Sequence, residues 1–351
     1  DGDYTVTQVL AVAASPDGTD VAYARAHSVA VLDSSGRQVA ALPVDGSPTG
    51  LAFGPGPDEL MVMTTTAIYL WQPLGGRPSL EVSQPSAPID AAVSANGSVL
   101  AAADTGGTVG VWNAVTGKAV RTFRPSDNHS SSYYSPMPLR IAVSADGSVV
   151  ASGNADGTVF LWDTASGKLI AVQRVSTWPI LELSPAPSGS ALLAVDWLQP
   201  NSASARPGTG KVLAFATGRV IASYSSPTPA DPATPIDPGA GLSPDGSFIY
   251  AGSLGLAPTP PGGSLTVYQV TGGQAMTGLP TFLESGAASY SEFPADPWSP
   301  DGTLILAGNS VYRCDACQAL QGLQATAESR DKWSVPLSVG SDRPPATDPY
   351  A

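Results

Sequence analysis

A short turn sequence recurs five times along this 351-residue chain, each time between two apolar runs. The copies read Ser-Pro/Ala-Asp/Asn-Gly-Ser/Thr and occupy residues 15–19, 94–98, 144–148, 243–247 and 299–303. Recurrence of one local sequence is typical of a repeat architecture, in which each repeat forms one supersecondary unit stacked on its neighbours. The fold class must therefore be read from the period of the repeat.

The underlying period is about 40 residues, with insertions. Ser94 and Ser144 lie 50 residues apart, and a degenerate copy at Ser184 follows 40 residues later. A second degenerate copy at Gly54 divides the 79 residues between Ser15 and Ser94 into 39 and 40. The pattern predicts seven repeats, with anchors at 15, 54, 94, 144, 184, 243 and 299.

Each repeat contains four strand-like runs, which the third and fourth copies show most clearly. In the third repeat they are residues 91–93, 99–103, 109–113 and 119–123, separated by tight turns. The fourth repeat has the same order. Runs of four to six aliphatic and β-branched residues bounded by Gly, Asn and Asp are typical of strands joined by turns. Every repeat is therefore expected to form one four-stranded antiparallel sheet.

A recurring dipeptide ends the third strand of most repeats. Leu161-Trp-Asp163 is the strongest copy and Val111-Trp-Asn113 the next, with weaker copies at 31–33, 70–72, 267–269 and 311–313. In period, turn and dipeptide the chain resembles the WD-repeat β-propeller family over residues 9–313. The resemblance implies an all-β, seven-bladed β-propeller whose blades are four-stranded antiparallel sheets. No copy has the Gly-His dipeptide of strong family members. We therefore assign no residue of this chain to the buried Asp-His-Ser/Thr-Trp hydrogen-bond network of that family.

The last repeat has too few residues after its third strand for a fourth strand of the usual pattern. Residues 4–8 form a strand-like run before the first repeat, and we expect them to complete the last blade and close the ring. The predicted organisation is one propeller over residues 1–317. A short C-terminal helix-like segment and Pro-rich tail, residues 318–351, are expected to pack on it.

Surplus residues over the period are concentrated on one face of the expected propeller. The turns between strands one and two and between strands three and four share one face, and the turns between strands two and three share the other with the blade connections. The five insertions all belong to the second face, at 124–138, 196–210, 225–238, 254–263 and 284–296. Insertions on one face commonly mark the binding surface of a repeat protein. Neutral drift is the alternative, because long surface loops cost little stability.

Six aromatic residues on this face are candidates for binding a protein or peptide partner. Tyr and Trp suit that role because they combine a large apolar area with a polar tip. Packing of the Pro-rich loops onto the blades is the alternative. The six are Tyr133, Tyr134, Trp178, Trp197, Tyr290 and Phe293.

The composition of the chain bears on whether it binds nucleic acid, whether it spans a membrane and in which compartment it is found. The formal net charge is −13 and no stretch clusters Lys and Arg, so we predict no nucleic-acid partner. No apolar run approaches the roughly 18 residues of a membrane span, so we predict no transmembrane segment in this chain. Membership of a membrane-associated complex is compatible with this prediction. The acidic, Lys-poor, Ala/Ser/Thr/Pro-rich composition resembles exported proteins of high-GC actinobacteria. It implies a bacterial, extracytoplasmic protein, and we expect that a chain beginning at Asp1 is processed or excised from a longer one.

Motifs for catalysis are scarce. There are two histidines, His27 and His129, and no nucleophile elbow, P-loop, dinucleotide fingerprint or His-Glu-x-x-His. Asp90 and Arg140 occupy equivalent positions at the expected channel rim, with Asp237 and Asp296 near it. These residues form either a metal or substrate site or a structural ion pair. We predict no catalytic residue, no bound metal and no cofactor.

The cysteine pair Cys314 and Cys317 directly follows the third strand of the last repeat. We predict that the two cysteines form a disulfide if the compartment is oxidising. The alternatives are a reduced structural pair and half of a zinc site shared with another subunit. Readily labelled thiols would indicate a cytoplasmic location instead.

The sequence thus favours a non-catalytic scaffold or sensor that binds a protein or peptide on the insertion-bearing face, either alone or as a subunit of a larger assembly. The alternatives from other classes are a lactonase-like propeller hydrolase with an axial metal and a domain that senses glycans or small molecules.

Overall fold

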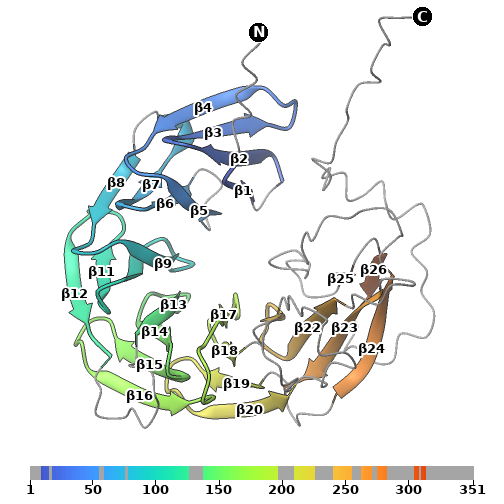
Figure 1. The fold of residues 1–351 in the computed structure, drawn as a ribbon. Coiled ribbons are helices and arrows are strands. Elements are labelled where there is room, and N and C mark those ends of the chain that lie inside the picture. The colour runs from blue at the N-terminus through green and yellow to red at the C-terminus, as the bar shows by residue number, and fades with distance from the viewer. Residues whose placement is uncertain are drawn as a thin grey trace, which may run out of the picture.

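The computed structural model describes residues 9–15, 18–54, 59–75, 78–125, 137–196, 209–225, 240–254, 262–270, 275–282, 304–307 and 310–313. This part of the chain is almost entirely β-structure, with one short 3-10 helix, η1 (Pro73–Gly75). Its strands form six four-stranded antiparallel sheets and one two-stranded sheet, arranged around a central axis as an open ring (Figure 1). The expected all-β propeller is confirmed, and the seven sheets agree with seven blades.

Every four-stranded blade is a meander whose strands pair in chain order. Blade one comprises β1 (Ala11–Ala14), β2 (Asp20–Arg25), β3 (Ser28–Asp33) and β4 (Gln38–Pro43), and blade two β5 (Pro48–Phe53), β6 (Leu60–Thr64), β7 (Ala67–Trp71) and β8 (Pro78–Ser83). Blade three comprises β9 (Pro88–Val93), β10 (Val99–Asp104), β11 (Val109–Asn113) and β12 (Ala119–Phe123), and blade four β13 (Pro138–Val143), β14 (Val149–Asn154), β15 (Thr158–Asp163) and β16 (Leu169–Arg174).

The remaining sheets continue the pattern. Blade five comprises β17 (Glu182–Pro185), β18 (Ala191–Asp196), β19 (Thr209–Ala214) and β20 (Val220–Ser225), and blade six β21 (Ala240–Leu242), β22 (Phe248–Leu254), β23 (Gly262–Gln269) and β24 (Ala275–Phe282). Blade seven is described by β25 (Leu304–Ala307) and β26 (Ser310–Arg313).

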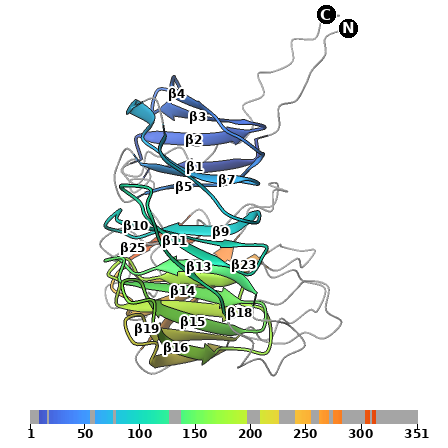
Figure 2. The same cartoon turned by 90° about the vertical axis from the view of Figure 1, so that its left-hand side faces the viewer.

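The first strand of each four-stranded blade lies nearest the axis and the fourth lies at the rim (Figure 1). Neighbouring first strands contact one another, as β1 does with β5, β9 with β13, and β17 with both β13 and β21. Seen from the side, the strands run across the thickness of the ring (Figure 2). Each turn therefore lies on one of two opposite faces.

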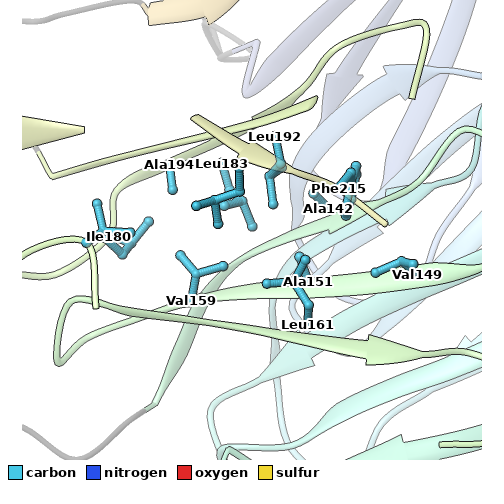
Figure 3. Packing of buried hydrophobic residues seen from close by; sticks show 12 residues of the cluster. Ala142, Val149, Ala151, Val159, Leu161, Ile180, Leu183, Leu192, Ala194 and Phe215 are labelled. Carbon is cyan, nitrogen blue, oxygen red and sulfur yellow. The ribbon is translucent and has the colours of Figure 1, made fainter. Parts of the chain in front are cut away.

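The core lies between neighbouring blades. One cluster joins Ala151 and Leu161 of blade four to Leu192 and Phe215 of blade five, all with exposed fractions of 0% (Figure 3). Every residue of β14 is buried, because a blade in the ring is covered on both faces. Burial of each large aliphatic side chain contributes about 1.5–3 kcal/mol. The core thus fixes the spacing and the angle of the blades.

The two tryptophans of the recurring dipeptide lie on third strands of neighbouring blades, as the sequence predicts: Trp112 on β11 and Trp162 on β15. Trp162 stacks on Phe123 of the preceding blade, with ring centroids 5.0 Å apart and planes inclined by 3°. Trp162 is therefore an inter-blade packing residue. A Cβ at Gly110 would collide with the ring of Trp112, so glycine there makes room for the indole.

The turn of blade five lies two residues later than the sequence anchor at Ser184. Ala186 N–H bonds to Ala191 O at 2.9 Å, just as Ser144 N–H bonds to Val149 O, and Gly189 takes the positive φ of the turn. The degenerate copy is thus Ala186-Pro-Ser-Gly-Ser190. The predicted anchor was wrong because alanine stands in place of the first serine.

The first and last described sheets lie on either side of the opening of the ring (Figure 1). The predicted closing strand, residues 4–8, and the C-terminal segment, residues 318–351, lie outside the described residues. Ring closure and the predicted domain organisation stay predictions.

Candidate functional site

The meander gives the ring two unlike faces. Turns from first to second and from third to fourth strands lie on one, which we name the short-turn face. Turns from second to third strands and the connections between blades lie on the other, which we name the insertion face because all five sequence insertions belong to it.

The recurring turn sequence builds the short-turn face. Ser144 Oγ accepts the N–H of Val149 at 2.9 Å and donates to Asp146 Oδ1 at 2.7 Å, and Asp146 Oδ1 accepts the N–H of Ser148 at 3.0 Å. The bonds that Asp146 accepts, the one from the Ser148 N–H foremost, lower its pKa. The equivalent bonds recur at Ser94 and Asn96 and at Ser243 and Asp245. The repeated polar residues of this turn are therefore structural.

The same turns join neighbouring blades. Asn96 donates its backbone N–H to Ala145 O at 3.0 Å and its side-chain Nδ2 to Asp146 O at 2.9 Å. Arg121 Nη2 donates to Ala165 O at 2.8 Å. These bonds link blades three and four on the short-turn face.

Five of the six aromatic residues that the sequence predicts for the insertion face lie outside the described residues: Tyr133, Tyr134, Trp197, Tyr290 and Phe293. The sixth, Trp178, is described. It lies in the connection between β16 and β17, and 42% of its surface is exposed.

Hydrogen bonds from three segments hold the backbone at Trp178. Its N–H donates to Ser176 Oγ at 3.1 Å, and that hydroxyl donates in turn to Asp196 Oδ2. Asp196 ends β18, is fully buried, and also accepts the N–H of Thr209 at 2.6 Å and its hydroxyl at 3.0 Å. Asp196 and Thr209 are the residues on either side of residues 197–208, which belong to one of the insertions. The carboxylate of Asp196 therefore links both ends of this insertion to the segment that carries Trp178.

The same segment lies directly on the β14–β15 turn of blade four. Gly157 O accepts the N–H groups of Val175 and Ser176 at 3.0 and 3.2 Å, and Asn154 O accepts that of Ile180 at 3.0 Å. Gly157 has a φ of +82°, and a Cβ there would lie 2.6 Å from the carbonyl oxygen of Trp178 and collide with that of Ser176. Only glycine permits this approach. The backbone that presents Trp178 is thus preorganised.

A second exposed apolar residue lies across the same turn. Met137 O accepts the N–H of Ala155 at 2.8 Å, and 36% of Met137 is exposed. The β14–β15 turn is therefore flanked by two exposed apolar residues whose backbone is hydrogen-bonded, Met137 before blade four and Trp178 after it.

The predicted rim residues Asp90 and Arg140 lie on the inner strands β9 and β13, in the half of each strand nearer the insertion face. Asp90 Oδ2 accepts the N–H of Ile141 in the next blade at 2.8 Å. Arg140 Nε donates to Leu181 O of the blade after that at 2.7 Å. Among the described residues the ion pairs are Arg37–Asp33 and Arg174–Asp156, so Asp90 and Arg140 bond to neighbouring backbone rather than to each other.

Glu182 is a third charged residue on this inner wall, and the sequence reasoning missed it. With the turn of blade five at Ala186, Glu182 stands four residues before its turn, as Asp90 and Arg140 do in theirs. Burial raises the pKa of Glu182 from 4.5 to about 7; Arg140 opposes this rise and Asp90 adds to it. Burial likewise raises the pKa of Asp90, against the hydrogen bond from Ile141 and the charge of Arg140. Alignment on the Gly of the turn, rather than on its Ser, would have found Glu182.

The other predicted site residues lie outside the described residues: Asp237, Asp296, Cys314 and Cys317. Within the described ranges, no group of three or more His, Cys, Asp or Glu side chains could hold a metal ion. No helix in the same ranges is long and apolar enough to cross a membrane.

Comparisons with known proteins support the propeller assignment. Residues 120–163 match the model of the WD domain, G-beta repeat. This segment runs from β12 to the end of β15 and includes Leu161-Trp-Asp163. A comparison with curated protein sequences finds no match.

Among solved structures, the chain is similar to the Cps50 (Swd1) β-propeller domain of Myceliophteria thermophila. The TM-score is 0.56 at 15% sequence identity, and the alignment covers 77% of this chain and 86% of that one. At this identity the likeness concerns the fold alone. The predicted bacterial origin stays a prediction. The chain is an all-β propeller in which residues 120–163 match the WD repeat family.

Proposed function

We propose that this chain is a non-catalytic interaction platform whose insertion face binds a protein or peptide partner. The observation that carries the proposal is Trp178, which is 42% exposed although its backbone is fixed by Ser176, Asp196 and Gly157. An aromatic side chain presented from a rigid backbone loses little conformational entropy on binding, and such residues are typical interface anchors.

The fold supports the proposal at the level of analogy. Propellers of WD repeats commonly serve as scaffolds for protein interactions, and repeat proteins bind through an extended face that carries their insertions. The short-turn face is less suited to binding a partner, because the polar side chains of its recurring turns form hydrogen bonds within the turns and between blades. Assembly into a larger complex belongs to the same proposal, as does an extracytoplasmic location.

The test compares Trp178→Ala with Val115→Ala in quantitative affinity capture from the native source. Val115 is 75% exposed in the β11–β12 turn of the short-turn face, so it is a matched control for loss of apolar surface. We expect the partners of the wild-type chain to lose about 2 kcal/mol of binding, roughly thirtyfold in affinity, with Trp178→Ala and little with Val115→Ala. The reverse order, or equal retention by both variants, would contradict the proposal.

A further inference from the structure

Three basic side chains lie on the insertion face of blades three, four and five, and Trp178 lies in the connection between the last two of these blades. Arg124 directly follows β12, Arg174 ends β16, and Lys211 lies near the start of β19. All three positions are at the insertion-face ends of their strands, in blades three, four and five. Together with Met137 and Trp178 they define what we name the Trp178 sector.

The hydrogen bonds of these side chains go mainly to carbonyl oxygens. Arg124 Nη1 donates to Gly106 O at 3.3 Å, Arg174 Nη1 to Asp156 O at 3.1 Å, and Lys211 Nζ to Arg174 O at 2.6 Å. Carbonyl oxygens orient a cation without neutralising its charge. Among the described residues, no carboxylate lies within 4.0 Å of Arg124 or Lys211, and Arg174 has Asp156 Oδ2 at 3.8 Å.

The described carboxylates at the insertion-face ends of the second strands in the same three blades are buried. Asp104, Asp156 and Asp196 are 0%, 1% and 0% exposed. Each bonds to the threonine that follows its turn or insertion: Thr108, Thr158 and Thr209. Asp90 and Glu182 lie deeper, on the inner wall beside Arg140. Among the described residues on the insertion face of blades three to five, the basic side chains are therefore more exposed than the carboxylates, although the whole chain carries −13.

We propose that the Trp178 sector binds an acidic segment of the partner that also carries a large apolar side chain. The apolar side chain packs on Trp178 and Met137, and the carboxylates pair with Arg124, Arg174 and Lys211, where charge-assisted bonds replace water. The acidic remainder of the chain repels such a segment, which steers it to the sector. The inference rests on the proposed function and adds the chemistry of the partner.

The test is a selection of random peptides displayed on phage against the purified full chain. We expect the enriched peptides to be acidic with at least one large apolar residue, and their affinity to fall with rising salt. Arg124→Glu should weaken them about tenfold or more, and Arg124→Gln by less, because charge reversal adds repulsion to the lost attraction. Arg124 is exposed, so both variants are expected to fold, and melting curves verify this.

The matched control is Lys118→Glu, which makes the same kind of charge change at an exposed position of the short-turn face in the same blade. It should leave peptide binding unchanged. Neutral or basic peptides whose binding is lost with Trp178→Ala would overturn the inference and leave the proposed function standing. Acidic peptides equally insensitive to Arg124→Glu and Trp178→Ala would overturn both, and the absence of any enriched peptide would overturn the inference.

Discussion

The carboxylate of Asp90 accepts the backbone N–H of Ile141 across the boundary between blades three and four, with 2.8 Å between Oδ2 and N. Arg140 repeats the arrangement one blade further, through the carbonyl of Leu181. Charged side chains at equivalent positions of the inner strands thus link consecutive blades through backbone groups. Their position at the rim follows from this structural role.

We therefore expect Asp90→Ala to lower the free energy of unfolding by about 1–3 kcal/mol, because it leaves the Ile141 N–H without its acceptor. Asp90→Asn keeps an acceptor oxygen and should cost clearly less. Urea denaturation of the two variants and the wild type measures the difference. Equal stability of Asp90→Ala and the wild type would show that the bond does not link the blades.

The raised pKa of Glu182 makes stability depend on pH. Because its folded-state pKa, about 7, lies above its usual value of 4.5, the folded chain binds more protons than the unfolded chain between these values. The stabilising contribution of protonated Glu182 to the free energy of unfolding is fully present below about pH 4.5 and is lost as the pH rises through about 7. Since the group is partly exposed, we expect a change of about 1–2 kcal/mol over this range.

Glu182→Gln isolates this contribution, because it removes the titration and leaves Asp90 and Arg140 in place. The difference in unfolding free energy between wild type and variant, measured from pH 4.5 to 8, should shift in favour of the variant as the pH rises. A difference that is constant with pH would contradict the raised pKa.

Gly157 tests the preorganisation of the Trp178 segment. Gly157→Ala combines an unfavourable positive φ with a collision against two backbone carbonyls, so we expect it to cost about 3 kcal/mol or more. Gly36 has a similar φ of +78° with no atom within 4 Å of a Cβ, so Gly36→Ala reports the conformational cost alone, about 1–2 kcal/mol. Thermal or urea unfolding compares them. Equal costs would show that the segment does not press on the turn.

Thiol labelling of the native chain without reductant tests the proposed extracytoplasmic location. We expect no free thiol at Cys314 and Cys317 in protein prepared from its source, and little loss of global stability on reduction, because a disulfide between them closes only a short loop. Two readily labelled thiols would favour the cytoplasm.

The sequence predicts the blades well because the recurring turn is a local structure. Ser144, Asp146 and Gly147 supply the acceptor, the cap and the positive φ within four residues, so a motif of this kind is readable without the fold. Because the prediction depended on this local sequence, it misplaced the turn of blade five, where Ala186 lacks the serine hydroxyl but the turn still forms. Glu182 was lost with that error.

The site was predicted only in part, because its contacts join residues distant in sequence. The sequence predicts that Trp178 lies on the insertion face, because it stands in a connection between two repeats. The network that holds it does not, since Ser176, Asp196 and Thr209 meet only after blades four and five have packed. Likewise, the sequence aligned Asp90 with Arg140, but their bonds to backbone groups of neighbouring blades depend on the closeness of the inner strands.

The central claim is that partners bind the insertion face, and hydrogen exchange of the chain with and without its captured partner tests it most directly. The account predicts slower exchange in the β14–β15 turn and the Trp178 connection, residues 155–157 and 175–180, with unchanged exchange in the short turns at residues 145–147 and 164–168. Protection confined to the short turns would contradict it.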